Sequence, residues 1–216
     1  MTIPKIAVLI SGRGSNMQAI HRACIDGSIK AQISHVISNN EDAAGLDYAQ
    51  QNGIPATIVN HRDFATRSEF EAELVNKIDQ NGQPDMVLLA GFMRRLTARF
   101  TDHYVGRLIN IHPSLLPKHP GLDTHAKALE CGDKWHGCSV HFVNEALDGG
   151  PVIARGIVPV LAGDTESALA DRVLATEHRV LPTVVQHFFN RSLTCQNNHV
   201  KIHGQVLNYP LTYYYH

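Results

Sequence analysis

The stretch "VLISGRGSNMQAI", residues 8–20, changes its pattern twice within a few residues. A continuous apolar run ends at Ile10 and is followed by Gly12 and Gly14. Apolar residues then recur at helical spacing from Met17 onward. The two glycines allow tight backbone turns that a Cβ atom would hinder. A strand, a glycine turn and a helix in this order predict the first unit of an α/β domain.

The alternation of strand and helix continues through the first half of the chain. Apolar runs predict five strands, at 5–10, 33–38, 56–59, 86–90 and 107–112. The segments between them carry helical spacing, and Thr66 with Glu69 forms a capping-box pattern. Strands that alternate with helices form parallel sheets that are covered on both sides. We therefore expect an α/β fold with an open, twisted, mostly parallel sheet and helices on both faces.

The second half of the chain is less regular. Residues 113–136 are rich in proline, glycine and histidine, with one short predicted helix at 124–131, which is typical of a functional loop. The remaining elements are predicted from their periodicity. They are strands at 138–143 and 151–160, a long amphipathic helix at 165–189 and a strand pair within 199–207. We expect one compact domain with no internal repeat.

The composition limits the classes of function. The 216 residues are 44% hydrophobic and carry a formal net charge of -1, which supports a full core and gives no basic footprint for nucleic acid. No apolar run approaches the roughly 18 residues of a membrane span, and the N-terminus lacks the charged lead of a signal peptide. We therefore expect a cytoplasmic protein. The four cysteines show no CxxC spacing, and His199 and His203 have no acidic or cysteine partner nearby, so we expect free thiols and no metal.

The glycine turn also predicts an anion site. Ser15 and Asn16 are good helix N-caps, and the first N–H groups of a helix can bind an anion. No Lys-Ser or Lys-Thr pair follows the glycines, so the turn is not an NTPase P-loop. The third glycine of a dinucleotide fingerprint would fall at Met17, and no carboxylate follows the second strand, which disfavours a nicotinamide cofactor. A monophosphate ligand fits better; the alternative is a tight turn that binds nothing.

A second motif, "NIHPSLLP" at 110–117, ends the fifth predicted strand. Residues i and i+2 of a strand face the same side, so Asn110 and His112 project together from its end. Pro113 has no N–H group and terminates the pairing. In "ALDGGPVI", residues 146–153, Asp148 precedes two glycines, and we expect an exposed and flexible carboxylate there. Alternatively, these residues are a polar strand end and an ordinary turn.

Together these three residue types suggest one kind of chemistry. An asparagine can only form hydrogen bonds, a histidine can donate to an oxyanion and move a proton, and an aspartate can keep that histidine charged. The pattern places no serine or cysteine nucleophile with them. We therefore expect direct attack by a substrate amine on an acyl group, with stabilisation of a tetrahedral oxyanion. Glu177 lies on an apolar stripe of the long predicted helix, where a carboxylate is costly unless it is paired.

Five motifs in order, "LISGRGSN", "LLAGFMRRL", "NIHPSLLPKHPG", "HGCSVHFV" and "LDGGPVI", resemble those of the phosphoribosylglycinamide formyltransferase family. The resemblance covers about 5–190 and implies a Rossmann-like formyltransferase fold. It implies transfer of a formyl group from 10-formyltetrahydrofolate to the amine of N1-(5-phosphoribosyl)glycinamide, in de novo purine biosynthesis and without a metal. It also implies a single domain over 1–216, with a phosphate-binding half at 1–106, a catalytic and folate-binding half at 107–190, and a tail at 191–216.

The resemblance assigns roles residue by residue. The catalytic residues would be Asn110, His112 and Asp148. The residues that bind the phosphoribosyl substrate would be Gly14, Ser15, Asn16 and, at the ribose hydroxyls, Glu177. The folate pocket would contain Arg67, Met93, Arg94, Arg95, Leu96, Asn110 and Val143.

Two positions depart from the family pattern, both in the loop near the folate. His119 stands where the family usually has tyrosine or phenylalanine, and Asp123 where it often has histidine. Because aspartate and histidine titrate in different ranges, we expect Asp123 to change how loop closure responds to pH.

Other functions of the same core remain as alternatives. A formyltetrahydrofolate deformylase would carry an added N-terminal domain, and a methionyl-tRNA formyltransferase would carry a C-terminal domain and a basic surface; we expect neither here. A phosphate-binding module without catalysis is disfavoured by the joint presence of Asn110, His112 and Asp148. We expect small-molecule substrates, no nucleic-acid or membrane partner, and a monomer or homodimer. The role of residues 196–216 is not predicted.

Overall fold

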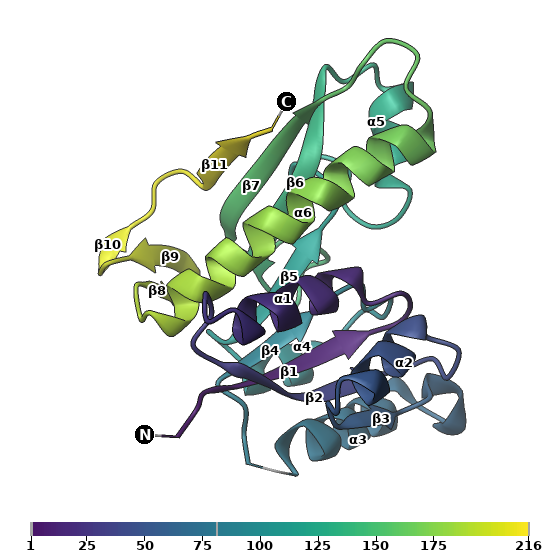
Figure 1. Ribbon diagram of the computed structural model, residues 1–216, viewed down its shortest axis with the longest axis vertical. Helices are drawn as coiled ribbons and strands as arrows, with labels where there is room; N and C mark the ends of the chain where they lie inside the picture. Colours follow the sequence, from purple (N-terminus) through teal and green to yellow (C-terminus); the bar gives the residue numbers. More distant parts are fainter. Residues whose placement is uncertain (1, 81, 216) are drawn as a thin grey trace. The chain divides into compact units, whose positions relative to one another are not determined.

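The computed structural model describes residues 2–80 and 82–215 (Figure 1). Residues 1, 81 and 216, which the predicted single domain also includes, lie outside the described residues. The chain forms two compact units, residues 1–109 and 110–216.

The first unit contains a parallel sheet. Its strands are β1 (Lys5–Ile10), β2 (Gln32–Ser38), β3 (Ala56–Ile58) and β4 (Met86–Leu89). They lie in the order β4-β1-β2-β3, and every pair is parallel. The side chains of β4 and nearly all of those of β1 are buried, which is why these strands are continuous apolar runs.

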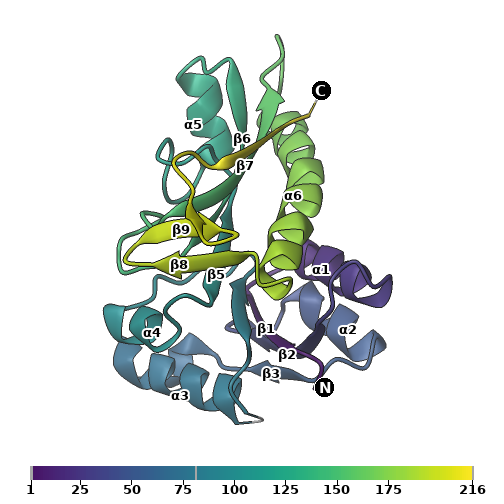
Figure 2. The same ribbon diagram turned by 90° about the vertical axis from the view of Figure 1, so that its left-hand side faces the viewer.

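Helices cover both faces of this sheet. They are α1 (Ser15–Ile25), α2 (Ala44–Gln51), α3 (Arg67–Asp79) and α4 (Ala98–His103), with a short 3₁₀ turn at His61–Asp63. Figure 2 shows α1 and α2 on one side of the strands and α3 and α4 on the other. The predicted capping box is confirmed, since Thr66 accepts from the Glu69 amide and the Glu69 side chain accepts from the Thr66 amide.

The second unit has a sheet of mixed direction. Its strands are β5 (Leu108–His112), which begins in the last residues of the first unit, β6 (Trp135–Phe142), β7 (Val152–Pro159) and β11 (Leu211–Tyr214). They lie in the order β11-β7-β6-β5; β6 and β7 are antiparallel, whereas β7 and β11 are parallel. The long helix α6 (Glu166–Phe189) packs on β6 and β7, and the short helix α5 (Thr124–Glu130) contacts α6. The prediction of an α/β fold with a mostly parallel sheet is confirmed.

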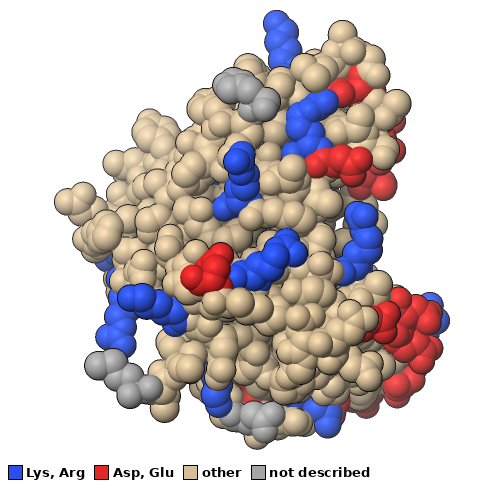
Figure 3. Space-filling model, in the orientation of Figure 1, with Lys and Arg blue, Asp and Glu red and all other residues tan. Residues whose placement is uncertain are grey.

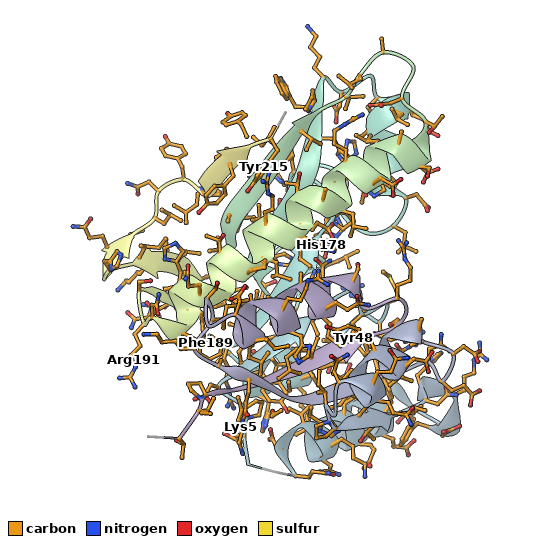
Figure 4. All side chains as sticks on the ribbon, in the orientation of Figure 1. Lys5, Tyr48, His178, Phe189, Arg191 and Tyr215 are labelled. Carbon is orange, nitrogen blue, oxygen red and sulfur yellow. The ribbon has the colours of Figure 1, made fainter. Side chains whose placement is uncertain are left out.

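The tail is more ordered than its sequence suggested. It contains three antiparallel strands, β8 (Leu193–Gln196), β9 (His199–Ile202) and β10 (Gln205–Val206), followed by β11 at the edge of the main sheet of this unit. The Arg179 guanidinium of α6 lies 5.1 Å from the ring centroid of Tyr215, which is labelled in Figure 4. The last residues of the tail are therefore attached both to β7 and to α6.

The surface agrees with the balanced composition. On the face shown in Figure 3, lysine and arginine side chains are scattered among uncharged residues and do not form one continuous patch. No helix within the described part of the chain is long and apolar enough to cross a membrane.

Candidate active site

Strand β5 ends with two polar side chains in the second unit. Asn110 is half-buried, whereas His112 keeps only 6% of its surface exposed. The Nδ1 atom of His112 lies 3.5 Å from Oδ2 of Asp148, and its Nε2 lies 3.0 Å from the carbonyl oxygen of His119. Each ring nitrogen thus faces an oxygen acceptor, and the doubly protonated ring is the form that can donate to both.

Asp148 lies between β6 and β7 and is more fixed than predicted. We expected an exposed and flexible carboxylate, but only 12% of the side chain is exposed. The backbone amide of Gly121 donates to Oδ2 at 2.9 Å, and the residue itself has a left-handed backbone with φ 48. The expectation was wrong because it treated the glycine turn alone, whereas a distant loop covers the carboxylate and supplies a hydrogen bond.

A second histidine, His141 on β6, belongs to the same group of contacts. Its Nδ1 lies 2.9 Å from the Phe142 carbonyl oxygen, to which it can only donate, so Nε2 is left to accept from the Asn110 amide at 3.1 Å. Burial is the main effect on its pKa, which lies below the usual value and favours this neutral form. Sequence reasoning did not assign His141 a role, although it lies within the quoted motif "HGCSVHFV". The sequence offered no clear signal, because the alternation in "CSVHFV" suggests exposed polar residues, whereas nearly all of β6 is buried.

A cluster of histidines surrounds the loop that follows β5. The rings of His125 and His136 are 3.1 Å apart, from Nδ1 to Nε2, and the ring of His119 packs edge-on against His136. Burial, and then the like charges of His125 and His119, lower the pKa of His136 to about 4. Burial also lowers the pKa of His125. Among the described residues, no group of three or more histidine, cysteine or acidic side chains has the arrangement of a metal site.

The glycine turn lies in the first unit, at the start of α1. Gly14 is the N-cap and has a left-handed backbone with φ 67, so the prediction of Ser15 or Asn16 as the cap was wrong. No side chain caps the helix in the described residues. Ser15 and Asn16 instead form the first turn of the helix, where backbone N–H groups have no partner within the helix. This arrangement can accept an anion, as the sequence suggested.

Five residues predicted to line the folate pocket also lie in the first unit. Arg67 begins α3, and the other four form the run Met93–Leu96 between β4 and α4. The start of α3 and this loop are joined, because the Thr97 amide and hydroxyl both donate to the Glu71 carboxylate. The Ser11 hydroxyl accepts from the Met93 amide at 2.8 Å. Leu96 is buried, whereas the other four side chains are exposed.

The two remaining predicted residues lie in the second unit. Val143 directly follows β6 and is half-buried. Glu177 lies on α6 with only 6% of its surface exposed, so the carboxylate on the apolar stripe is indeed buried. Burial raises the pKa of Cys138 on β6, and the charge of the Glu177 carboxylate adds to that effect.

The histidine, carboxylate and amide that the second unit brings together are groups that can carry out acid–base and oxyanion chemistry. The fold is that of the formyl transferases, whose family model matches residues 4–185. Phosphoribosylglycinamide formyltransferase of Escherichia coli is 50% identical over 202 residues, which are 94% of this chain and 95% of that protein. The solved phosphoribosylglycinamide formyltransferase of Coxiella burnetii is 44% identical, with a TM-score of 0.93 over 98% of this chain and 100% of that one.

The chain belongs to the phosphoribosylglycinamide formyltransferase family and is an enzyme that transfers a formyl group. A solved formyltetrahydrofolate deformylase of Pseudomonas putida has a similar fold with a lower sequence identity. It is 25% identical, with a TM-score of 0.83, and covers 93% of this chain and 70% of that one.

Proposed function

We propose that this enzyme transfers the formyl group of 10-formyltetrahydrofolate to the glycinamide amine of N1-(5-phosphoribosyl)glycinamide. The observation that carries the proposal is the placement of His112 between the Asp148 carboxylate and the His119 carbonyl, beside the Asn110 amide. This group can stabilise a developing negative charge and move a proton, and it contains no nucleophile that would form an acyl-enzyme. Membership of the family and the similarity to the phosphoribosylglycinamide formyltransferases of Escherichia coli and Coxiella burnetii support this substrate pair and, with it, a place in purine biosynthesis.

In the proposed mechanism the substrate amine attacks the formyl carbon directly. The carbonyl π electrons move to oxygen and give a tetrahedral oxyanion, which the Asn110 amide and the His112 imidazolium stabilise. The attacking nitrogen loses its proton to Asp148 through a water molecule, and Asp148 returns that proton through the water to N10 of the folate as the bond between N10 and carbon breaks. The products are the formylated glycinamide and tetrahydrofolate, so atoms and charge balance.

The remaining assigned residues would bind the two substrates. Gly14, Ser15 and Asn16 would hold the phosphate through backbone N–H groups at the start of α1. The buried Glu177 carboxylate would accept hydrogen bonds from the ribose hydroxyls. Arg67 would contact the distal end of the folate, and the other pocket residues, Met93, Arg94, Arg95, Leu96 and Val143, would line its rings. We further propose that the enzyme works in the cytoplasm on these small molecules, as a monomer or homodimer.

The test is an absorbance assay of folate deformylation with and without the ribonucleotide. We expect turnover that requires the ribonucleotide, together with formation of the formylated product. Turnover at the same rate without it would assign the chain to the deformylases. No turnover by a folded protein that binds the ribonucleotide would instead indicate a binding module.

A further inference from the structure

The carbonyl oxygen of His119 is a hydrogen-bond acceptor for His112, the proposed catalytic histidine. The direction in which this carbonyl points depends on an unusual backbone conformation at His119. His119 has φ 51, a left-handed conformation that a non-glycine residue adopts only when its surroundings enforce it. Its carbonyl oxygen lies 3.0 Å from Nε2 of His112. A change of this backbone toward the ordinary region would turn the carbonyl away from that nitrogen.

The side chain of His119 is held by Asp133. Its Nε2 lies 2.8 Å from Oδ2 of Asp133, and the two side chains are 13% and 11% exposed. Lys118 donates to the other carboxylate oxygen at 2.6 Å, but its side chain is 61% exposed. The hydrogen bonds from Lys118 and from His119 lower the pKa of Asp133, so this acceptor stays ionised.

Asp133 is itself fixed by the end of α5. Its amide donates to the Ala128 carbonyl at 3.0 Å, just after Gly132 has reversed the chain with φ 66. A short series of contacts therefore runs from α5 through Asp133 and the His119 ring to the His119 carbonyl and His112. All members lie in the second unit.

We propose that His119 is a positioning residue for His112: its ring, anchored on Asp133, holds the left-handed backbone whose carbonyl fixes the orientation and proton location of the catalytic imidazole. The proposal rests on the proposed function, because it assigns His112 the role given there. With Nε2–H committed to the carbonyl, the ring presents Nδ1 to Asp148. Without that acceptor, the ring can flip or exchange its tautomer.

The test compares His119→Phe with two other variants. Phenylalanine keeps an aromatic ring but cannot donate to Asp133, whereas His119→Gln keeps a donor. Lys118→Met removes the other, exposed donor to Asp133 and leaves the His119 contact in place, so it is the matched control. We expect His119→Phe to lower kcat about tenfold and to change the KM of the ribonucleotide little. This loss is smaller than the roughly hundredfold cost of moving a catalytic group by 1 Å, because His112 itself remains in place. His119→Gln should recover part of kcat, and Lys118→Met should stay near the wild type.

A second readout does not depend on activity. Long-range ¹H–¹⁵N spectra of histidine-labelled protein report the protonation of each ring nitrogen, and the His112 signals are assigned by their loss in His112→Gln. In spectra of the neutral ring, we expect the single proton on Nε2 of His112 in the wild type and in Lys118→Met, and a mixture of tautomers in His119→Phe. Asp133 and His136 contact the His119 ring, and Lys118 and His125 contact those two groups in turn. The spectra are therefore recorded over a pH series for all variants.

The outcomes separate the two proposals. An unchanged His112 spectrum and unchanged kcat in His119→Phe would overturn the positioning role. A lower melting temperature with unchanged kcat would mean that the contact with Asp133 only stabilises the loop, and would overturn the role as well. A wild type without formyl transfer would contradict the proposed function, while the spectra would still show whether His119 orients His112. If His119→Phe does not fold, Asp133→Asn weakens the same contact and is measured in its place.

Discussion

His112 and Asp148 come from a strand end and a turn that are distant in sequence, yet Nδ1 of the first lies 3.5 Å from Oδ2 of the second. The Gly121 amide binds the same carboxylate oxygen, and both side chains are largely shielded from water. A histidine and a carboxylate in such a setting interact more strongly than an exposed pair does.

This relationship predicts the effect of removing either partner. We expect His112→Ala and Asp148→Ala each to lower kcat by roughly a hundredfold or more, the scale of a lost acid–base group or oxyanion donor. Asn110→Ala should have an effect of the same order. Steady-state kinetics with both substrates measure these changes. The double variant His112→Ala/Asp148→Ala should lose little more than either single variant, because the two residues act as a unit. Full activity in any single variant would refute the role assigned to that residue.

The hydrogen bond between His141 and Asn110 predicts a further effect on catalysis. His141→Leu removes the acceptor that orients the Asn110 amide, so we expect kcat to fall by about tenfold, while the ground-state binding of either substrate changes little. His35→Leu is the matched control, because His35 is a buried histidine of the other unit whose Nε2 pairs with Thr57. Both variants should lose stability in urea denaturation. Only the His141 variant should lose turnover, and an equal loss in both would show that His141 acts through stability alone.

The buried histidines predict a loss of stability in acid. His136, with its pKa lowered from 6.5 to about 4, binds a proton more weakly when folded than when unfolded. The same direction holds for His125 and His141. Their contribution is therefore complete above about pH 6.5 and is lost as the pH falls through their lowered values. The free energy of unfolding should decrease by up to about 1.4 kcal/mol per pH unit for each such histidine.

Chemical denaturation across this pH range measures the slope. His136→Gln should make the free energy of unfolding depend less steeply on pH. His199→Gln, which replaces an exposed histidine, should leave that dependence unchanged. A slope that is equal in all three proteins would contradict the assignment of this acid sensitivity to His136.

Local sequence patterns predicted most of the fold, because each strand, turn or helix is encoded by the residues of a single segment. The run from β1 through Gly14 into α1 predicted strand, turn and helix, and the capping box at Thr66 placed the start of α3 correctly. Strand β8 was missed because "LTCQ" is only four residues long, and the inward-facing Leu193 and Cys195 give too short an alternation to predict a strand. The attachment of the tail to β7 was not predictable, because it depends on backbone hydrogen bonds to the edge of the sheet, and the tail sequence does not show which edge it pairs with.

The candidate site was predictable only in part, for the same reason. Asn110 and His112 were placed on one face by the period of a strand. The burial of Asp148 and the role of His119 depend on hydrogen bonds from residues that the sequence does not place beside them, namely Gly121 and Asp133. His141 was overlooked because a polar residue within an alternating strand pattern looks like an ordinary surface position, although it is buried.

The glycine turn allows a matched pair of substitutions that tests the proposed phosphate site. At Gly14, whose φ is +67, an added Cβ would lie 3.1 Å from both the Gly45 Cα and the Met17 Cε. At Gly12 an added Cβ would meet nothing within 4 Å. Gly14→Ala must therefore shift the turn that leads into α1, at a strain cost of about 1–3 kcal/mol, whereas Gly12→Ala need not. We expect Gly14→Ala to raise the KM of the ribonucleotide tenfold or more, since helix N–H groups bind an anion only when the backbone aims them correctly. The KM of the folate should change much less, and Gly12→Ala should resemble the wild type. If the Gly14 variant keeps its affinity for the ribonucleotide but has a lower melting temperature, the turn contributes only to stability and the phosphate binds elsewhere.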